Sequence, residues 1–386
     1  MKLYFFIICI VFNGLSFGQS ITVSNTNRYL TKSGQPFIWI GDTAWELFHR
    51  CSKEDAEYYF KKRSSQGFTV VQAVILAELD GLHTPNYYGE KPFKNIETLE
   101  VNIAYFEHVN NVIEIANQYG ITIALLPTWG DKIYKDTWGV GPEIFNIENA
   151  YSYGKWVGDW FKRQDNIIWV LGGDRNPRRQ SDDVEVWRNM AKGLTDAYGH
   201  KDSLLLTFHP QPNKEGASEW FHNDDWLDFN MFQTGHCRDL EVYNSIELSY
   251  KKIPMKPVIN GEPIYETHPV CFNAKDLGVS SAYDIRKAAY LSILSGAFGH
   301  TYGCHAVWQM YGDGFEGVNG PQDNWRNSLD LQGANQMKHL RNLLETKPIY
   351  LATPDQSVLL EKNLSAYERV QASSGKDFAV VYTALG

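Results

Sequence analysis

The 386-residue sequence has few cysteines, no block of like charges and no apolar run long enough to cross a bilayer. Without low-complexity stretches, a disordered chain is not expected. The formal net charge of −9 argues against a nucleic-acid backbone or an anionic membrane as the main partner. Beyond Cys9, the cysteines are too widely spaced for a dense disulfide framework, and their pairing stays open: Cys51, Cys237, Cys271 and Cys304.

The short apolar run at the N-terminus has the form of an export signal. Lys2 precedes the run Leu3 to Phe12, and Ser16-Phe17-Gly18 supplies small residues for cleavage. We therefore expect a signal peptide over residues 1–19 and a periplasmic or secreted mature protein without membrane insertion.

Apolar segments of strand length then alternate with helical patterns along most of the chain. After a β lead-in that begins at residue 20, the pattern predicts strands at 37–40, 70–76, 121–127, 167–171, 204–208, 229–233, 257–260 and 300–308. It predicts helices at 53–66, 103–119, 148–163, 182–198, 283–294 and 334–345, with no clear helix between the fifth and sixth strands.

This alternation favours an α/β fold, a (β/α)8 TIM barrel over residues 20–348. An open doubly wound sheet would carry a Gly-rich nucleotide turn after its first strand, and Gly41-Asp42-Thr43-Ala44-Trp45 is not such a turn. From residue 349 the pattern changes to short strands without helices, at 357–360, 366–372 and 378–382. We interpret residues 349–386 as the start of an incomplete C-terminal β-sandwich.

Two carboxylates stand out among the polar residues at the strand ends. Asp174 follows the buried strand Ile167 to Leu171 and the turn Gly172-Gly173, and Glu262 ends the seventh strand. Active groups of such barrels come from the carboxyl ends of the strands, and strands four and seven lie across the mouth from each other. Two carboxyl groups on either side of one bond are what glycoside hydrolysis requires, so Asp174 and Glu262 are the expected catalytic pair.

The placement of this pair resembles that in the large clan of retaining (β/α)8 glycosidases, in which the strand-four carboxyl is the acid/base and the strand-seven glutamate is the nucleophile. That clan usually has Asn-Glu at strand four, whereas this sequence has Asp174-Arg175-Asn176. Further motifs are similar to those of the apiosidase-like glycoside hydrolases (glycoside hydrolase family 140) over about residues 22–346. They are Gly41-Asp-Thr-Ala-Trp-Glu-Leu-Phe48, Ala77-Glu-Leu-Asp-Gly-Leu82, Leu126-Pro-Thr-Trp-Gly-Asp131, Leu171-Gly-Gly-Asp-Arg-Asn-Pro177, Gly261-Glu-Pro263, His300-Thr-Tyr-Gly303 and Trp308-Gln309-Met310.

This resemblance implies a periplasmic enzyme that releases the β-apiose-linked side chain of the plant pectin rhamnogalacturonan II. Asp174 and Glu262 stand where the catalytic pair of that family stands. We expect retention, with Arg175 holding either Asp174 or a uronate of the substrate. No cofactor or metal is expected. The further candidates for substrate binding are Asp42, Trp45, Glu78, Asn86, Trp129, Trp138, Arg175, Asn176, His209, His305, Trp308 and Gln309.

Two other classes of function stay open. A metal-dependent barrel hydrolase requires His209, His236 and His305 to converge, although the sequence has neither a His-x-His at the end of strand one nor a His-Glu-x-x-His helix. A carbohydrate-binding barrel without turnover is the other alternative, and the presence of both carboxylates argues against it.

Overall fold

The computed structural model describes residues 21–136, 138–312, 314–360 and 365–385. The predicted signal peptide, residues 1–19, lies outside this range. Within it, no helix combines the length and the apolar character needed to cross a membrane.

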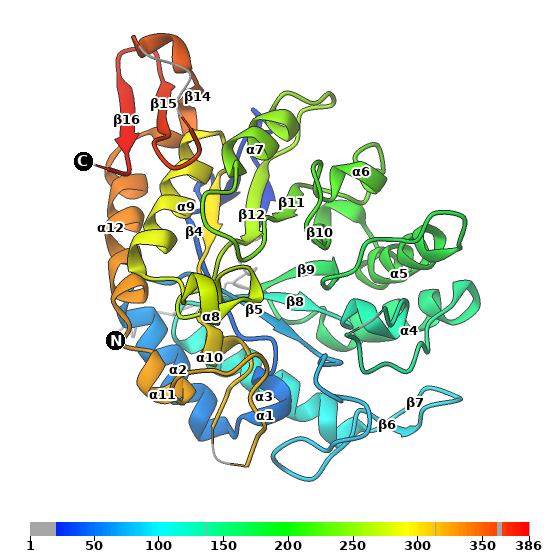
Figure 1. Ribbon diagram of the computed structural model, residues 1–386. Coiled ribbons are helices and arrows are strands. Elements are labelled where there is room, and N and C mark those ends of the chain that lie inside the picture. The colour runs from blue at the N-terminus through cyan, green and yellow to red at the C-terminus, as the bar shows by residue number, and fades with distance from the viewer. Residues whose placement is uncertain (1–20, 137, 313, 361–364, 386) are drawn as a thin grey trace, which may run out of the picture.

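Eight parallel strands form the centre of the molecule, in the spatial order β10-β9-β8-β5-β4-β13-β12-β11 (Figure 1). A hydrogen bond of 2.6 Å from Thr207 Oγ1 to the Phe229 carbonyl links the two end strands of this order, β10 and β11. The predicted TIM barrel is therefore confirmed. Its strands are β4 (Trp39–Thr43), β5 (Val70–Val74), β8 (Thr122–Leu126), β9 (Ile167–Gly172), β10 (Leu206–His209), β11 (Asn230–Gln233), β12 (Val258–Glu262) and β13 (Gly299–Thr301).

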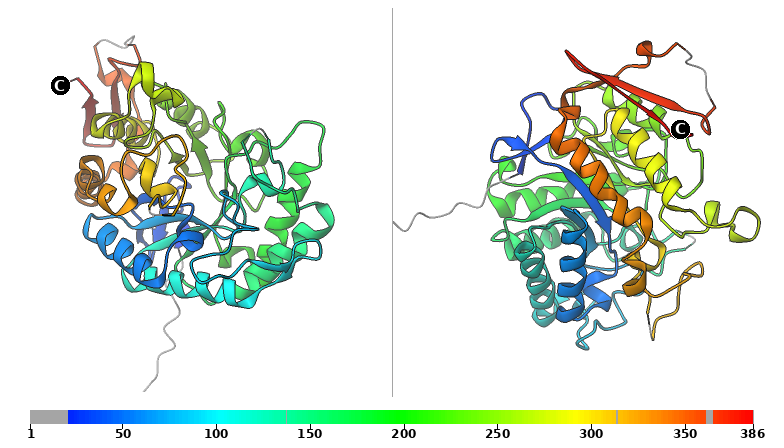
Figure 2. Two further views of the ribbon diagram at one scale, coloured as in Figure 1. Left: turned by 60° about the horizontal axis from the view of Figure 1, so that its bottom comes forward. Right: turned by 90° about the vertical axis from the view of Figure 1, so that its left-hand side faces the viewer.

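Helices surround these strands (Figures 1 and 2). The longer ones are α2 (Lys53–Ser65), α3 (Ile103–Gln118), α4 (Ile147–Phe161), α5 (Asp183–Tyr198), α7 (Val242–Tyr250), α9 (Ala282–Leu294) and α12 (Gln332–Thr346). Five short helices in the described range have about one turn each: α1 (Leu47–Arg50), α6 (Ser218–Phe221), α8 (Ala274–Leu277), α10 (His305–Trp308) and α11 (Trp325–Ser328). The lead-in is a small sheet of β1 (Ile21–Val23), β2 (Leu30–Lys32) and β3 (Gln35–Pro36), and β6 (Phe93–Asn95) pairs with β7 (Glu100–Val101).

The core consists of two apolar layers, which the alternation of side chains along each strand produces. On β5, Val70 and Val74 belong to the cluster inside the barrel, and Val71 and Ala73 belong to the cluster between strands and helices. Both faces of each strand are thus covered, which explains the nearly continuous apolar runs in the sequence.

The eighth predicted strand, residues 300–308, is wrong over most of its length. Only Gly299–Thr301 is a strand, and α10 begins at His305. Gly303 lies between them, where a Cβ atom would come within 1.9 Å of the Tyr265 ring. The chain bends at this close approach and turns into a helix instead of continuing the strand.

The C-terminal residues form a three-stranded antiparallel sheet of β14 (Thr353–Pro354), β15 (Val370–Ser374) and β16 (Ala379–Thr383). The predicted strand at 357–360 is wrong: Gln356–Val358 is a 3₁₀ turn, and residues 361–364 lie outside the described range. The sheet packs beside α9, where Tyr382 stacks on Tyr290 and Ser373 Oγ donates to the Leu294 carbonyl (Figure 2). The β-sandwich stays a prediction.

A buried histidine on β13 sets one expectation for stability. Neither ring nitrogen of His300 has a polar partner among the described residues, and burial lowers its pKa from 6.5 to about 3. The folded protein keeps this ring neutral, whereas the unfolded chain binds a proton below about pH 6.5, so stability falls as the pH drops below that value. We expect His300→Phe to remove about 2 kcal/mol of the stability difference between pH 7 and pH 5. Urea unfolding of both proteins at the two pH values measures this, and an unchanged difference would contradict it.

Candidate active site

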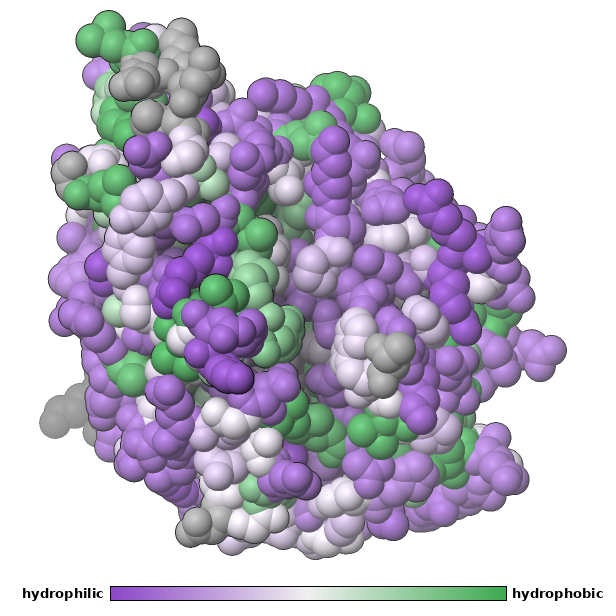
Figure 3. Space-filling view, viewed as in Figure 1, coloured by the Kyte–Doolittle hydropathy of each residue, from purple (hydrophilic) through white to green (hydrophobic). Residues whose placement is uncertain are grey.

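A cavity of about 630 Å³ opens at the carboxyl ends of the barrel strands. Figure 3 shows the face of the molecule viewed in Figure 1, which is hollowed near its centre and has apolar side chains beside the hollow. The described residues around the cavity include neither lysine nor arginine. They are Trp45, Glu78, Leu79, Trp129, Trp138, Asp174, Gln211, Pro212, Gln233, Gly235, His236, Glu262, Tyr265, His268, Phe272, Trp308, Val318 and Asn319.

Glu262 enters the cavity from the last position of β12. Below it, the buried Gln72 on β5 donates a hydrogen bond of 2.8 Å from Nε2 to the Gly261 carbonyl. This bond crosses the barrel interior and fixes the backbone just before the carboxylate. A side chain on a rigid strand with a second support is well placed for chemistry.

Two imidazoles and one amide contact the Glu262 carboxylate. Nε2 of His209 lies 3.1 Å from Oε2, Nε2 of His236 lies 3.2 Å from Oε1, and the Gln233 amide donates to Oε1 at 3.1 Å. Burial acts to raise the pKa of Glu262, but the two histidines lower it to about 2. Glu262 is therefore a carboxylate at neutral pH.

Asp174 follows β9 on a sharply turned backbone. Gly172, Gly173 and Asp174 all have positive φ, at 88°, 110° and 51°. A Cβ atom at Gly172 would lie 2.3 Å from the His209 carbonyl oxygen, and one at Gly173 would lie 2.7 Å from the Trp129 ring. Only glycine fits both positions, so the Gly-Gly pair is what allows Asp174 to turn into the cavity.

The surroundings of Asp174 differ from those of Glu262. Its Oδ2 accepts a hydrogen bond of 3.1 Å from Trp138 Nε1 and lies 3.5 Å from the Arg175 guanidinium. Burial and the negative charge of Glu262 raise the pKa of Asp174 to about 6, despite the opposing charge of Arg175. Asp174 therefore holds a proton under mildly acidic conditions in which Glu262 is charged.

His209 connects the two carboxyl residues. Its Nδ1 accepts the backbone N–H of Asp174 at 3.4 Å, so its hydrogen lies on Nε2 and faces Glu262. The Gln233 amide, which donates to Glu262, also lies near enough to Asp174 to oppose the rise of its pKa. Both carboxyl groups line the same cavity.

Two further titratable groups in the cavity stay neutral. Burial, followed by the charge of Asp174, raises the pKa of Glu78 well above its usual range. Burial and the charge of Glu262 do the same for the Tyr265 phenol. Both groups can donate a hydrogen bond to an oxygen of a ligand.

Four tryptophans of the described range line the cavity. Trp45 and Trp129 pack together at the base of the cavity with ring centroids 4.9 Å apart. Trp308 is nearly buried in the wall, whereas Trp138 is half exposed beside Asp174. Such faces suit the C–H surfaces of a sugar ring.

Several predicted binding residues do not line the cavity. Asp42 lies under α2, where Tyr59 Oη and Arg63 Nε donate to its carboxylate. The Asn86 side chain accepts two backbone N–H groups of its own turn. The Asn176 amide oxygen accepts a bond of 3.4 Å from Asn213.

His305, Gln309 and Arg175 lie behind the walls of the cavity. The His305 and His268 rings pack edge to face with centroids 4.5 Å apart. The Gln309 side chain forms hydrogen bonds with the backbone of residues 305 and 318. The Arg175 guanidinium donates to three backbone carbonyls, those of residues 134, 135 and 174. Its contact with Asp174 corresponds to one of the two roles expected of Arg175.

Gln233, Tyr265, His268 and Phe272 line the cavity without having been predicted from the sequence, and His236 was predicted only as a metal ligand of the alternative hydrolase. Gln233-Thr234-Gly235-His236 ends β11 with a polar turn like the one after β9, and this signal could have identified Gln233 and His236. The other three residues lie in an irregular loop after β12, for which periodicity gives no signal.

No group of three histidine, cysteine, aspartate or glutamate side chains in the described range is arranged to hold a metal ion. His209 and His236 are engaged with Glu262, and His305 lies behind His268. The convergence that a metal-dependent hydrolase requires is not seen in this part of the chain.

Comparison with known proteins gives one family and many structural neighbours. The profile described as "Apiosidase-like, catalytic domain" matches residues 24–350. A search of curated proteins gives no significant match. A solved structure described as a glycoside hydrolase is similar over 95% of this chain and 83% of its own, with 33% identity and a TM-score of 0.84.

A second solved structure is described as a family 5 glycoside hydrolase from Bacteroides vulgatus ATCC 8482. It has 32% identity and a TM-score of 0.85 over 95% of this chain and 80% of its own. A family 5 mannosidase from Rhizomucor miehei shares the fold alone, with 10% identity and a TM-score of 0.58 over 86% of this chain and 99% of its own.

Proposed function

The chain belongs to the family of apiosidase-like catalytic domains and is a glycoside hydrolase, and on this premise we propose that it is a retaining apiosidase. Its substrate is the β-apiose linkage in the side chains of the plant pectin rhamnogalacturonan II. Glu262 is the nucleophile and Asp174 is the acid/base.

In the first step, a Glu262 oxygen attacks the anomeric carbon of the bound sugar. The bond from that carbon to the leaving oxygen breaks, and Asp174 gives its proton to this oxygen. The products are a free alcohol on the leaving sugar and a glycosyl ester on Glu262. Because Asp174 is then a carboxylate, the charge that Glu262 loses reappears on the other side of the cavity.

In the second step, Asp174 removes a proton from a water molecule whose oxygen attacks the same anomeric carbon. The ester bond to Glu262 breaks and the carboxylate reforms beside His209 and His236. Two displacements at one carbon return the starting anomeric configuration.

The observation that carries this proposal is the placement of two carboxyl groups with different surroundings in one cavity: two imidazoles and an amide contact Glu262, whereas an indole N–H contacts Asp174. A pKa of about 2 for Glu262 and of about 6 for Asp174 suits a nucleophile and a proton donor. Retention is supported by the shared setting of the two carboxyl groups, which line one cavity together with the Gln233 amide, because retaining enzymes hold their pair only about 5–5.5 Å apart.

The lining of the cavity favours a neutral sugar at the bond that is cleaved. Three carboxyl groups and no cationic side chain face this space among the described residues, so a uronate there would lack a counter-charge. Apiose carries no carboxyl group, and its hydroxyls can bond to Glu78, Gln233 and His268.

The pH profile of kcat/KM follows from the two pKa values. Asp174 must be protonated and Glu262 ionised, so kcat/KM falls above an apparent pKa of about 6 and stays level at mildly acidic pH, where Glu262 is still a carboxylate. Initial rates over this range measure it. A rate that rises with pH through 6 would contradict Asp174 as the proton donor.

A panel of pectic oligosaccharides tests the substrate directly. We expect the protein to release apiose from rhamnogalacturonan II fragments, with NMR of the first product showing the anomeric configuration of the substrate. Release of another sugar would reject the apiosidase assignment and keep the glycosidase. Binding without release would favour a carbohydrate-binding barrel, and loss of release after chelation would favour a metal-dependent hydrolase.

Export through a cleaved signal over residues 1–19 is part of the same proposal. The disulfide between Cys237 and Cys271 supports it, since such bonds persist in oxidising compartments. Fractionation of producing cells, with N-terminal sequencing of the mature protein, tests it: a mature chain that begins at Met1 would contradict the signal.

A further inference from the structure

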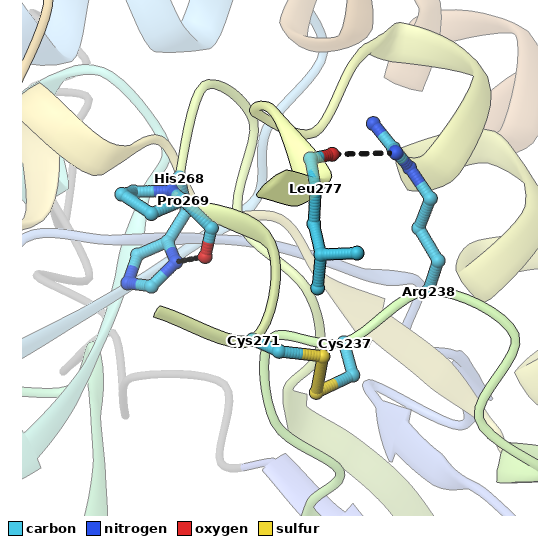
Figure 4. Close-up of a disulfide and its surroundings, with 6 residues drawn as sticks. All are labelled: Cys237, Arg238, His268, Pro269, Cys271 and Leu277. Carbon is cyan, nitrogen blue, oxygen red and sulfur yellow. Dashed lines mark hydrogen bonds between the residues drawn. A yellow bond between two sulfur atoms is a disulfide. The ribbon is translucent and has the colours of Figure 1, made fainter. Parts of the chain in front are cut away.

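Three consecutive residues after β11 contact the loop between β12 and α9, residues 263–281, which we call the β12–α9 loop. The His236 carbonyl accepts the backbone N–H of Cys271 at 2.9 Å. Cys237 forms a disulfide with Cys271 (Figure 4). Arg238 donates to the carbonyls of Leu277 and Val279 at 3.0 and 2.7 Å. The loop is thus fastened both at its middle and where it returns to α9.

The fastened segment supplies a wall of the cavity beside Glu262. The His236 and His268 rings stack with centroids 4.2 Å apart, and His268 Nδ1 donates to the Pro269 carbonyl at 2.7 Å (Figure 4). Phe272 stands against the edges of both rings, with centroids 5.0 Å from His268 and 5.7 Å from His236. The wall therefore connects the disulfide with the catalytic carboxylate through packed rings.

Phe272 is the unusual member of this wall. Its side chain lines the cavity although the residue is 64% exposed, and few apolar rings in the molecule are so open to solvent. Cys271 and Phe272 both have positive φ, at 51° and 60°, which is uncommon for residues with bulky side chains. Such a backbone conformation persists where the surrounding structure imposes it. Here the disulfide joins Cys237 to Cys271, the residue directly before Phe272.

We propose that Phe272 is a sugar-stacking residue of the active site and that the Cys237–Cys271 disulfide is the positioning element that holds it in place. The ring takes the apolar C–H face of a neutral sugar. Because Phe272 lies on the side of Glu262, this sugar is the one that Glu262 attacks, whereas the leaving group lies toward Asp174 and Trp138. The inference rests on the proposed function and adds a binding subsite to it.

Binding measurements on proteins that also carry Asp174→Asn test the subsite while turnover is strongly slowed. The probe is the oligosaccharide fraction of rhamnogalacturonan II, and the readout is the Kd from calorimetry. We expect Phe272→Ala to weaken binding about 5- to 20-fold and Phe272→Trp to restore it. The matched control is Tyr87→Ala, since Tyr87 is 63% exposed and lies outside the cavity lining, and its Kd should not change.

A cycle with the disulfide tests the positioning role. Cys237→Ser with Cys271→Ser should weaken binding as much as Phe272→Ala does, and all three changes together should weaken it no further. If the serine variant does not fold, treatment of the folded protein with a phosphine reductant gives the same comparison.

A Kd within twofold of the parent in Phe272→Ala, or no measurable binding by the parent, overturns the subsite. Additive effects in the combined variant overturn the role of the disulfide. Turnover of the same oligosaccharides by the unsubstituted protein is measured separately, so failure of the proposed activity is distinguished from failure of this inference.

Discussion

Replacing Glu262 by glutamine is expected to lower kcat by about 10⁴- to 10⁶-fold, because the amide cannot form the glycosyl ester on which both steps depend. The change is nearly isosteric, and the Gln233 and histidine contacts surround a side chain of the same shape. Loss of the negative charge should also lower the pKa of Asp174, since Glu262 is one of the groups that raise it. Steady-state kinetics gives the first result, and NMR titration of the Asp174 carboxyl carbon gives the second.

Glu266→Gln is the matched control for this experiment. Glu266 is another buried glutamate, but its carboxylate accepts bonds from Tyr302 and from the backbone of Gly333, outside the cavity lining. This variant should lose thermal stability while its kcat stays within a few-fold. A Glu262→Gln protein that keeps more than a hundredth of the activity would show that Glu262 is not the nucleophile.

Replacing Asp174 by asparagine is expected to lower kcat/KM for oligosaccharides by about 10²- to 10⁴-fold, because the leaving sugar then departs without a proton. An aryl glycoside with an acidic phenol needs no such proton, so the first step on that substrate should be nearly as fast as in the parent protein. Burst kinetics measures the rate of the first step on each of the two substrates. If the variant lost as much rate on the aryl glycoside as on the oligosaccharide, Asp174 would not be the acid. Cleavage of the oligosaccharide at the parent rate would also contradict this role.

The barrel could be predicted because buried strands and amphipathic helices alternate along most of the sequence. The meeting of Asp174 and Glu262 in one cavity followed from the same pattern, since carboxyl ends of parallel strands meet at one mouth. Asp42 shows where this reasoning was incomplete. Side chains alternate along β4, so Asp42 points the same way as Ile40, toward the helices, and meets Arg63 instead of the cavity.

The β12–α9 loop could not be derived from periodicity. Its wall depends on a disulfide across 34 residues and on positive φ at Cys271 and Phe272, neither of which leaves a local pattern. The ending of β13 at Thr301 has a similar cause, because it depends on the ring of Tyr265 packing against Gly303 from another segment. Contacts between distant segments decided these features.

Covalent trapping tests the central claim most directly. A 2-deoxy-2-fluoro glycoside of the cleaved sugar with a good leaving group slows the second step more than the first, so the glycosyl ester accumulates and peptide mass spectrometry locates it. We expect the label on Glu262, with one sugar per chain and none on the Glu262→Gln protein. A label on another residue, or hydrolysis with inversion and no label, would contradict the double displacement between Glu262 and Asp174.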